Sequence, residues 1–242
     1  MKDMIAIIYV VILAYFLLGA IGFYFINRKK AKTASRKSWT KYITYFLIIN
    51  ILFFSIVLQP LVFRALSVII IAFGMAELIM LYRKQEFRQS GFFVLAMTVF
   101  LMLSTGFWKF SGVRMELILF TFIILSIFDA FSQISGQLWG KTKIAPKISP
   151  NKTVGGTVGG ASTALASAYF LRELSTRNLE ETMLLSAGII VFAFLGDIAA
   201  SYYKRRFNVK DYSRLIPGHG GFLDRFDSMI AGGAWVALFL YL

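Results

Sequence analysis

The sequence predicts an all-α, polytopic membrane protein with about eight transmembrane helices and both termini on the non-cytoplasmic side. Its mean hydropathy is +0.70 and only 16% of its residues are charged, against about 25% in soluble domains. Apolar runs recur along the chain with lengths of roughly 17–25 residues, which is what a helix needs to cross the hydrocarbon core. These runs are continuously apolar and do not alternate with period two, so the pattern disfavours a transmembrane β-barrel.

The apolar runs predict transmembrane segments at 4–26, 42–58, 62–82, 91–108, 115–138, 154–171, 183–203 and 228–242. The first run lacks a strongly basic start and a small-residue cleavage site, so we expect a retained helix and not a cleaved signal peptide. No internal repeat is visible, and we expect one integral membrane domain over 1–242, with N-terminal helices in 1–110 and catalytic helices and loops in 111–242. The chain has no cysteine, which excludes disulfides and thiolate chemistry.

The basic residues fix the expected topology because they gather in alternate loops. Twenty of the 26 Lys and Arg residues follow the first, third, fifth or seventh segment. They are Arg28, Lys29, Lys30, Lys32, Arg36, Lys37 and Lys41, then Arg83, Lys84 and Arg88, then Lys141, Lys143, Lys147 and Lys152, then Lys204, Arg205, Arg206, Lys210, Arg214 and Arg225. The positive-inside rule places these loops in the cytoplasm. The net charge of +14 is then explained by topology and anionic lipid headgroups, and nucleic acid is not an expected partner.

Acidic residues interrupt several of the predicted helices. Asp129, Asp197 and Glu77 lie in apolar runs, where a charged side chain costs roughly 2.5–3.5 kcal/mol unless it is paired or hydrated. Asp224 and Asp227 stand at the start of the last helix, three residues apart and therefore on one side of it. Such acids at one depth predict a divalent-metal site with oxygen ligands. Asp129 alone is also compatible with a simple ion pair or cap, and a structural role is the favoured interpretation of Glu77.

Two cytoplasmic segments carry features of phosphate binding. The segment "WGKTKIAPKISPNKTVGGTVGGAS" brings lysines, Ser149 and Thr153 to the start of a helix, where free N–H groups favour an anion. Its glycines are equally explained as a small-residue packing face. In the second segment, "PGHGG" can fold its amides around an anion, with Asp224 and Arg225 next to it. We expect a functional role for His219. A metal site, a phosphate-binding loop and nearby lysines together fit in-line displacement at phosphorus.

The stretch "SYYKRRFNVKDYSRLIPGHGGFLDRFD" resembles the signature of the CDP-diacylglycerol synthases, also called phosphatidate cytidylyltransferases. The residues in register are Ser201, Lys204, Arg205, Lys210, Asp211, Ser213, Pro217, His219, Gly220, Gly221, Asp224, Arg225 and Asp227. Upstream, "SPNKT", Gly196-Asp197 and the spacing of Asp129, Gly136, Gly140 and Lys141 are also similar to the family. Departures from its pattern are Tyr203, Gln137 and Gly155.

The resemblance implies an enzyme that transfers CMP from CTP to phosphatidic acid, giving CDP-diacylglycerol and pyrophosphate, with Mg²⁺ and a nearby K⁺ as cofactors. The candidate catalytic residues are Asp197, Asp224, Lys210 and His219. The candidate metal ligands are Asp197 and Asp224, joined by Asp227 and Asp129. The candidate phosphate- and nucleotide-binding residues are Lys152, Thr153, Lys204, Arg205, Gly220, Gly221 and Arg225. We expect the protein to lie in a bacterial inner membrane, in contact with membrane lipids, with its active site facing the cytoplasm. The resemblance is also compatible with a homodimer.

Three alternatives stay open. A CTP-dependent lipid kinase of the polyprenol type would transfer the γ-phosphoryl group instead. A non-enzymatic ion carrier would use the intramembrane acids for cations and would not need the phosphate-binding features. The same cytidylyl transfer could also act on a phosphatidate with unusual chains or linkages.

Overall fold

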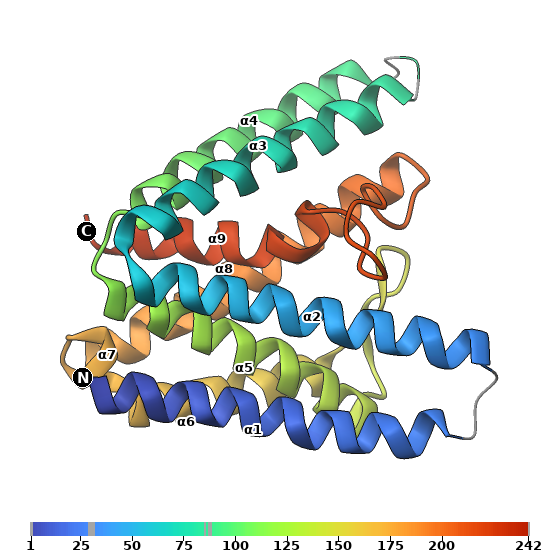
Figure 1. Ribbon diagram of the computed structural model, residues 1–242. Coiled ribbons are helices and arrows are strands. Elements are labelled where there is room, and N and C mark those ends of the chain that lie inside the picture. The colour runs from blue at the N-terminus through green and yellow to red at the C-terminus, as the bar shows by residue number, and fades with distance from the viewer. Residues whose placement is uncertain (1, 29–31, 85, 87–88, 242) are drawn as a thin grey trace.

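The protein is an assembly of long helices with one small hairpin, seen in a computed structural model that describes residues 2–28, 32–84, 86 and 89–241 (Figure 1). The long helices are α1 (Lys2–Asn27), α2 (Lys32–Leu58), α3 (Pro60–Lys84), α4 (Ser90–Phe110), α5 (Met115–Trp139), α6 (Val154–Phe170), α8 (Leu179–Arg206) and α9 (Leu223–Phe239). The short elements are α7 (Arg172–Ser175) and the antiparallel strands β1 (Lys143–Ala145) and β2 (Ser149–Thr153). Every predicted transmembrane segment therefore coincides with a long helix.

The length and composition of the helices confirm a polytopic membrane protein. Six of the helices in the described part of the chain are long and apolar enough to cross a membrane, namely α1, α2, α3, α4, α5 and α8. The other two predicted segments, α6 and α9, have 17 residues each, which is the lower limit for a spanning helix. Both α6 and α9 pack against the longer helices α5 and α8.

The predicted alternation of the loops is visible as two ends of the helix assembly. The α8–α9 loop, the β1–β2 hairpin, the start of α2 and the end of α3 lie at the right of Figure 1, whereas the labelled ends of the chain lie at the left. The basic loops therefore share one end, here called the basic end, as an even number of crossings requires. Lys29, Lys30 and Arg88, three of the charges used to predict this topology, lie outside the described residues.

The centre of the assembly is formed by α5, α8 and α9. Helix α9 lies beside α8 and α4 and also touches α5 and α3, so it has neighbours on several sides. Most of its residues are buried, including Met229, Ile230 and Val236. Helix α1, in contrast, packs mainly on α2 and exposes a row of large apolar side chains. This distribution is what a bilayer-embedded helix bundle requires, because lipid covers the outer apolar faces.

Two predicted segment starts and one predicted secondary structure differ in the structure. Helix α2 begins at Lys32, ten residues before the predicted start of the transmembrane segment, and the added residues include neither Gly nor Pro, the two residues that disfavour a helix most. Helix α9 begins at Leu223 and not at 228, so Asp224 and Arg225 lie in its first turn. The segment "SPNKT" forms strand β2 of a hairpin that the all-α prediction did not include.

The glycine-rich start of α6 packs tightly on α5, as the small-residue interpretation of that segment predicts. A Cβ atom on Gly160 would lie 2.7 Å from the carbonyl oxygen of Phe128, and one on Gly156 would lie 2.7 Å from that of Ser132. Separations below 3.0 Å from backbone atoms leave no room for a methyl group. These glycines therefore let two helices approach closely, and the amide of Gly156 is already bonded to Thr153 Oγ1 at 3.1 Å.

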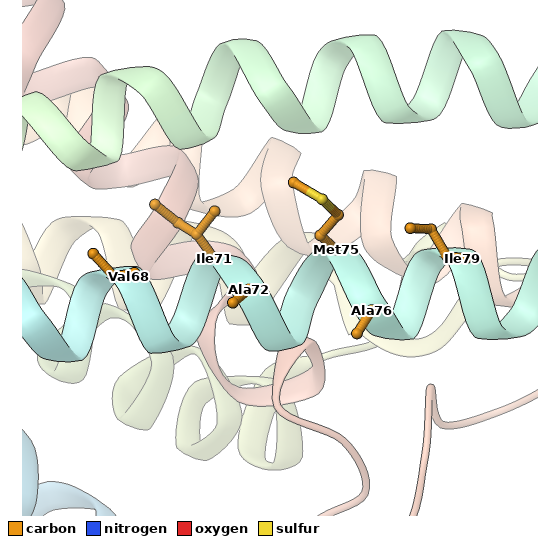
Figure 2. Close-up of a pocket in the computed structure, with 6 residues that line it drawn as sticks. All are labelled: Val68, Ile71, Ala72, Met75, Ala76 and Ile79. Carbon is orange, nitrogen blue, oxygen red and sulfur yellow. The ribbon is translucent and has the colours of Figure 1, made fainter.

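An apolar hollow of about 390 Å³ runs along one side of α3. It is lined by Val68, Ile71, Ala72, Met75, Ala76 and Ile79, which repeat at helical spacing (Figure 2). Several of these residues are exposed, and none is polar. The hollow therefore shares no lining residue with the polar site that the sequence predicts.

Candidate functional site

The predicted catalytic carboxylates lie at the contact between α8 and α9, near the basic end. On α8, Asp197, Ser201 and Lys204 are spaced at i, i+4 and i+7 and therefore share one face of the helix. On α9, Asp224 and Asp227 share the first two turns. Since the two helices pack side by side, the sequence pattern brings these groups together from two separate helices.

Asp224 is buried and is the most densely hydrogen-bonded of the predicted ligands. Its Oδ1 receives the ammonium of Lys204 at 2.6 Å, and its Oδ2 accepts from the backbone amides of Tyr212 at 2.9 Å and Gly221 at 2.8 Å. The side chains of Lys204 and Asp224 are only 11% and 2% exposed. This low exposure matters because breaking a buried ion pair is far more costly than breaking a surface pair.

The loop 207–222 folds around this carboxylate. Gly218 and Gly220 adopt φ angles of 77° and 83°, a region that side chains other than glycine rarely enter. Ile216 and Gly220 pair through an amide-to-carbonyl bond of 2.8 Å. Within the PGHGG segment the amide of Gly221 donates to the protein's own Asp224, and the predicted binding of a phosphate by this segment stays a prediction.

Asp197 forms a second pair of carboxylate and ammonium. Its Oδ2 lies 2.6 Å from Lys152 Nζ, and its Oδ1 accepts a long bond of 3.3 Å from the Ser201 hydroxyl. Lys152 comes from strand β2, so the hairpin delivers this lysine to the α8 face. The Asp197 side chain is 33% exposed, which leaves it more accessible than Asp224. Asp129 and Asp227 each interact electrostatically with Asp197.

A third carboxylate, Glu77 of α3, holds the signature loop against the N-terminal helices. Glu77 is 2% exposed. Its Oε1 accepts from the Ser213 hydroxyl at 2.6 Å and from the amide of Phe222 at 2.9 Å, and its Oε2 accepts from the amide of Leu223 at 2.8 Å. These amides belong to the first turn of α9, where helix N–H groups lack partners within the helix. Glu77 therefore caps α9 from a neighbouring helix.

The glycine at 221 is required by Glu77. A Cβ atom at this position would collide with Glu77 Oε1 and would lie 2.8 Å from its Cδ. Gly220 is constrained in the same way, because its Cβ would lie 2.7 Å from Asp224 Oδ2. The structure therefore assigns Gly220 and Gly221 to the seating of two carboxylates, and their predicted contact with phosphate stays a prediction.

Burial and nearby charges shift the pKa values of two loop side chains, Tyr212 and His219. Burial, with the negative charges of Asp227 and Asp224 nearby, raises the pKa of Tyr212 well above its usual value. Its hydroxyl stays protonated and donates to the Ala200 carbonyl at 3.1 Å. Burial, with the Arg225 and Lys41 charges nearby, lowers the pKa of His219. The imidazole is therefore neutral at pH 7 and contributes no charge.

A model of the cytidylyltransferase family matches residues 86–242, which is more than half of the chain. The chain belongs to the cytidylyltransferase family. The match begins just before α4 and contains α5, the hairpin, α8, the signature loop and α9. It confirms the resemblance predicted from the signature, whereas Glu77 and α2 lie outside the matched residues.

Curated relatives give the same result over a similar stretch. A phosphatidate cytidylyltransferase of Haemophilus influenzae is 40% identical over 131 residues, which is 52% of this chain and 46% of the relative. A protein of the same name from Staphylococcus haemolyticus is 36% identical over 130 residues, which is 52% of this chain and 50% of the relative. Another, from Rickettsia bellii, is 34% identical over 122 residues, which is 47% of this chain and 53% of the relative. The chain thus spans about half the length of the curated relatives it matches.

The remaining predicted site residues of this family member divide into two groups. Arg205 donates to the carbonyl oxygens of Ile148 and Val209, both at 3.1 Å, so it fastens the hairpin to the end of α8. Thr153 is 3% exposed and caps α6, with Gly136 and Gly140 packed against its hydroxyl. Lys210 and Arg225 are exposed at the basic end, where they are accessible to a phosphate.

The donor set fits a magnesium ion that is completed by substrate. Among the described residues, no three acidic or histidine side chains form a group that could hold a metal alone, so the four predicted ligands do not make a closed cage. Mg²⁺ is commonly bound through only one or two carboxylates together with substrate phosphates and water. Asp224 Oδ1 accepts a single donor and Asp197 Oδ1 only a long one, so both oxygens retain lone pairs for a cation.

Sequence reasoning missed the partners of Glu77 and the role of Tyr212. Glu77 was noticeable as an acid in an apolar helix, but its three donors come from residues about 140 positions later in the chain. Tyr212 lies between Asp211 and Ser213 of the signature but is not itself part of the pattern. The raised pKa of its hydroxyl follows from burial and nearby charges, which the sequence does not show. Neither role has a local sequence signal.

Proposed function

We propose that the protein transfers CMP from CTP to phosphatidic acid, forming CDP-diacylglycerol and pyrophosphate at the cytoplasmic face of a bacterial inner membrane. The family match and the names of the relatives support the reaction class. The observation that carries the proposal is the pairing of two carboxylates with two lysines, Asp197 with Lys152 and Asp224 with Lys204, at one end of a membrane-embedded helix pair.

The bond changes follow from the two substrates. An oxygen of the lipid phosphate forms a bond to the α-phosphorus of CTP, and the bond from that phosphorus to the bridging oxygen of the β-phosphate breaks. Pyrophosphate leaves with the electron pair. Because both reactants are anionic, such transfer depends chiefly on positioning and on neutralising charge.

The residues of this chain supply both kinds of charge that the reaction needs. Lys152 and Lys204 place ammonium groups next to the carboxylates, where they can balance phosphate oxygens. Asp197 and Asp224 would hold Mg²⁺, which would supply Lewis-acid stabilisation of the phosphates. Glu77 and Asp224 together fix the loop 207–222 and the start of α9 through backbone amides. The loop carries the exposed Lys210, and the first turn of α9 carries the exposed Arg225.

Release of pyrophosphate tests this function directly. Purified protein in detergent, given CTP, phosphatidic acid and Mg²⁺, is expected to release pyrophosphate only when both substrates are present and to stop when the metal is chelated. A lipid kinase would release CDP and would require a polyprenol or another lipid alcohol. The proposal fails if folded protein releases no pyrophosphate, or releases it without phosphatidic acid.

A further inference from the structure

A second group of cations lies at the basic end, on a helix outside the family match. Arg36, Lys37, Thr40 and Lys41 of α2 line an open cavity of about 480 Å³ together with Gly218 of the signature loop. The four α2 residues lie at i, i+1, i+4 and i+5, so they cover one side of the helix. We call this cavity the α2 groove.

The positive charge of the α2 groove is not balanced within the described part of the protein. Lys152 and Lys204 each contact a carboxylate at 2.6 Å, whereas no described acidic side chain forms an ion pair with Arg36, Lys37 or Lys41. The hydroxyl of Thr40 donates to the carbonyl oxygen of Arg36 at 3.0 Å, which leaves its oxygen lone pairs available. Three neighbouring cations without a counter-charge favour binding of an anion.

The signature loop rests directly on this groove. A Cβ atom on Gly218 would lie 2.8 Å from Lys41 Cγ, so the loop backbone touches the lysine stem. His219 stacks on Tyr45, one turn along α2 from Lys41, with ring centroids 6.1 Å apart. The Nδ1 atom of His219 is buried and has no hydrogen-bond partner among the described residues. The groove is therefore bounded by the loop that leads into Asp224 at the start of α9.

We propose that the α2 groove is a phosphate-binding site that receives the phosphate of one of the two substrates, either the phosphatidate headgroup or the triphosphate of CTP. The three cationic side chains are exposed and neighbour one another along α2, and one guanidinium with two ammonium groups can together contact several oxygens of one phosphate. The groove is at the membrane-surface end of the molecule, where a lipid headgroup and a soluble nucleotide meet. The identity of these two ligands rests on the proposed function, but the presence of a phosphate site does not.

Equilibrium binding by purified protein in detergent tests this site without requiring turnover. The double variant Arg36→Gln/Lys41→Gln is compared with Arg83→Gln/Lys84→Gln, which removes the same charges from exposed positions at the same end of the protein. Each is titrated separately with CTP plus Mg²⁺ and with phosphatidic acid in mixed micelles. Arg36→Lys/Lys41→Arg keeps the charge, and the apparent unfolding temperature of each variant checks that it is folded.

We expect Arg36→Gln/Lys41→Gln to weaken one of the two ligands about five- to tenfold, the loss for two partly exposed charge contacts. Loss confined to phosphatidic acid assigns the site to the headgroup, and loss confined to CTP assigns it to the nucleotide. The proposal is overturned if both double variants lose the same affinity, if neither loses any, or if wild-type protein binds neither ligand. Because pyrophosphate release is a separate assay, failure of this site is distinguishable from failure of the proposed reaction.

Discussion

Replacing Asp224 by Asn is expected to reduce turnover by about 100- to 1,000-fold, which corresponds to a rise of roughly 2.7–4.1 kcal/mol in the activation barrier. In Asn one carboxylate oxygen becomes an NH₂ group. Either the ammonium of Lys204 or the amides of Tyr212 and Gly221 then face a donor instead of an acceptor. The measurement is the rate of pyrophosphate release at saturating CTP and phosphatidic acid.

A carboxylate far from the site provides the control for this substitution. Asp3 is exposed in the first turn of α1, and Asp3→Asn should leave the rate unchanged. The apparent unfolding temperature of Asp224→Asn separates lost chemistry from lost structure, since the protein should remain inserted and folded. Normal turnover in Asp224→Asn would contradict the place that we give this carboxylate in the site.

Replacing Glu77 by Ala is expected to lower the free energy of unfolding by roughly 3–5 kcal/mol and to release the signature loop. One buried donor, the amide of Leu223, and two part-buried donors, Ser213 Oγ and the amide of Phe222, lose their acceptor together. An unsatisfied buried donor costs about 1–3 kcal/mol. Glu77→Gln should be less severe, because one oxygen remains as an acceptor. Protease cleavage within 207–222 and the apparent unfolding temperature report the two effects.

Ser67 of the same helix gives a matched control for Glu77. It is fully buried, but its hydroxyl bonds only to the Arg64 carbonyl within α3. Ser67→Ala should therefore leave the loop protected and turnover intact, whereas Glu77→Ala should expose the loop and lose turnover. Equal loop protection in the two variants would show that Glu77 does not hold α9 and the loop in place.

The transmembrane architecture follows from the sequence because its signal is local. A run of apolar residues specifies a spanning helix without reference to the rest of the chain, and alternating basic loops specify the ends. The starts of α2 and α9 were wrong because polar residues continue both helices beyond the apolar run. At α9 this extension depends on Glu77, which lies in a helix remote in sequence.

The site could be predicted only as a set of residues and not as an arrangement. The resemblance identified Asp197, Asp224, Lys152 and Lys204, but not that each carboxylate already contacts one of the lysines. It also assigned Thr153 to the nucleotide, whereas its hydroxyl caps α6 inside the α5–α6 contact. These roles depend on which groups face each other across helices, and a linear pattern does not contain that information.

The fate of the CTP phosphorus atoms tests the central claim most directly. CTP is labelled separately at the α- or the γ-phosphorus and incubated with the purified protein, Mg²⁺ and phosphatidic acid, and the lipid fraction is then counted. The account predicts that α label enters the lipid and γ label leaves as pyrophosphate. Transfer of γ label to phosphatidic acid or to a lipid alcohol, with no α label in the lipid, would contradict it.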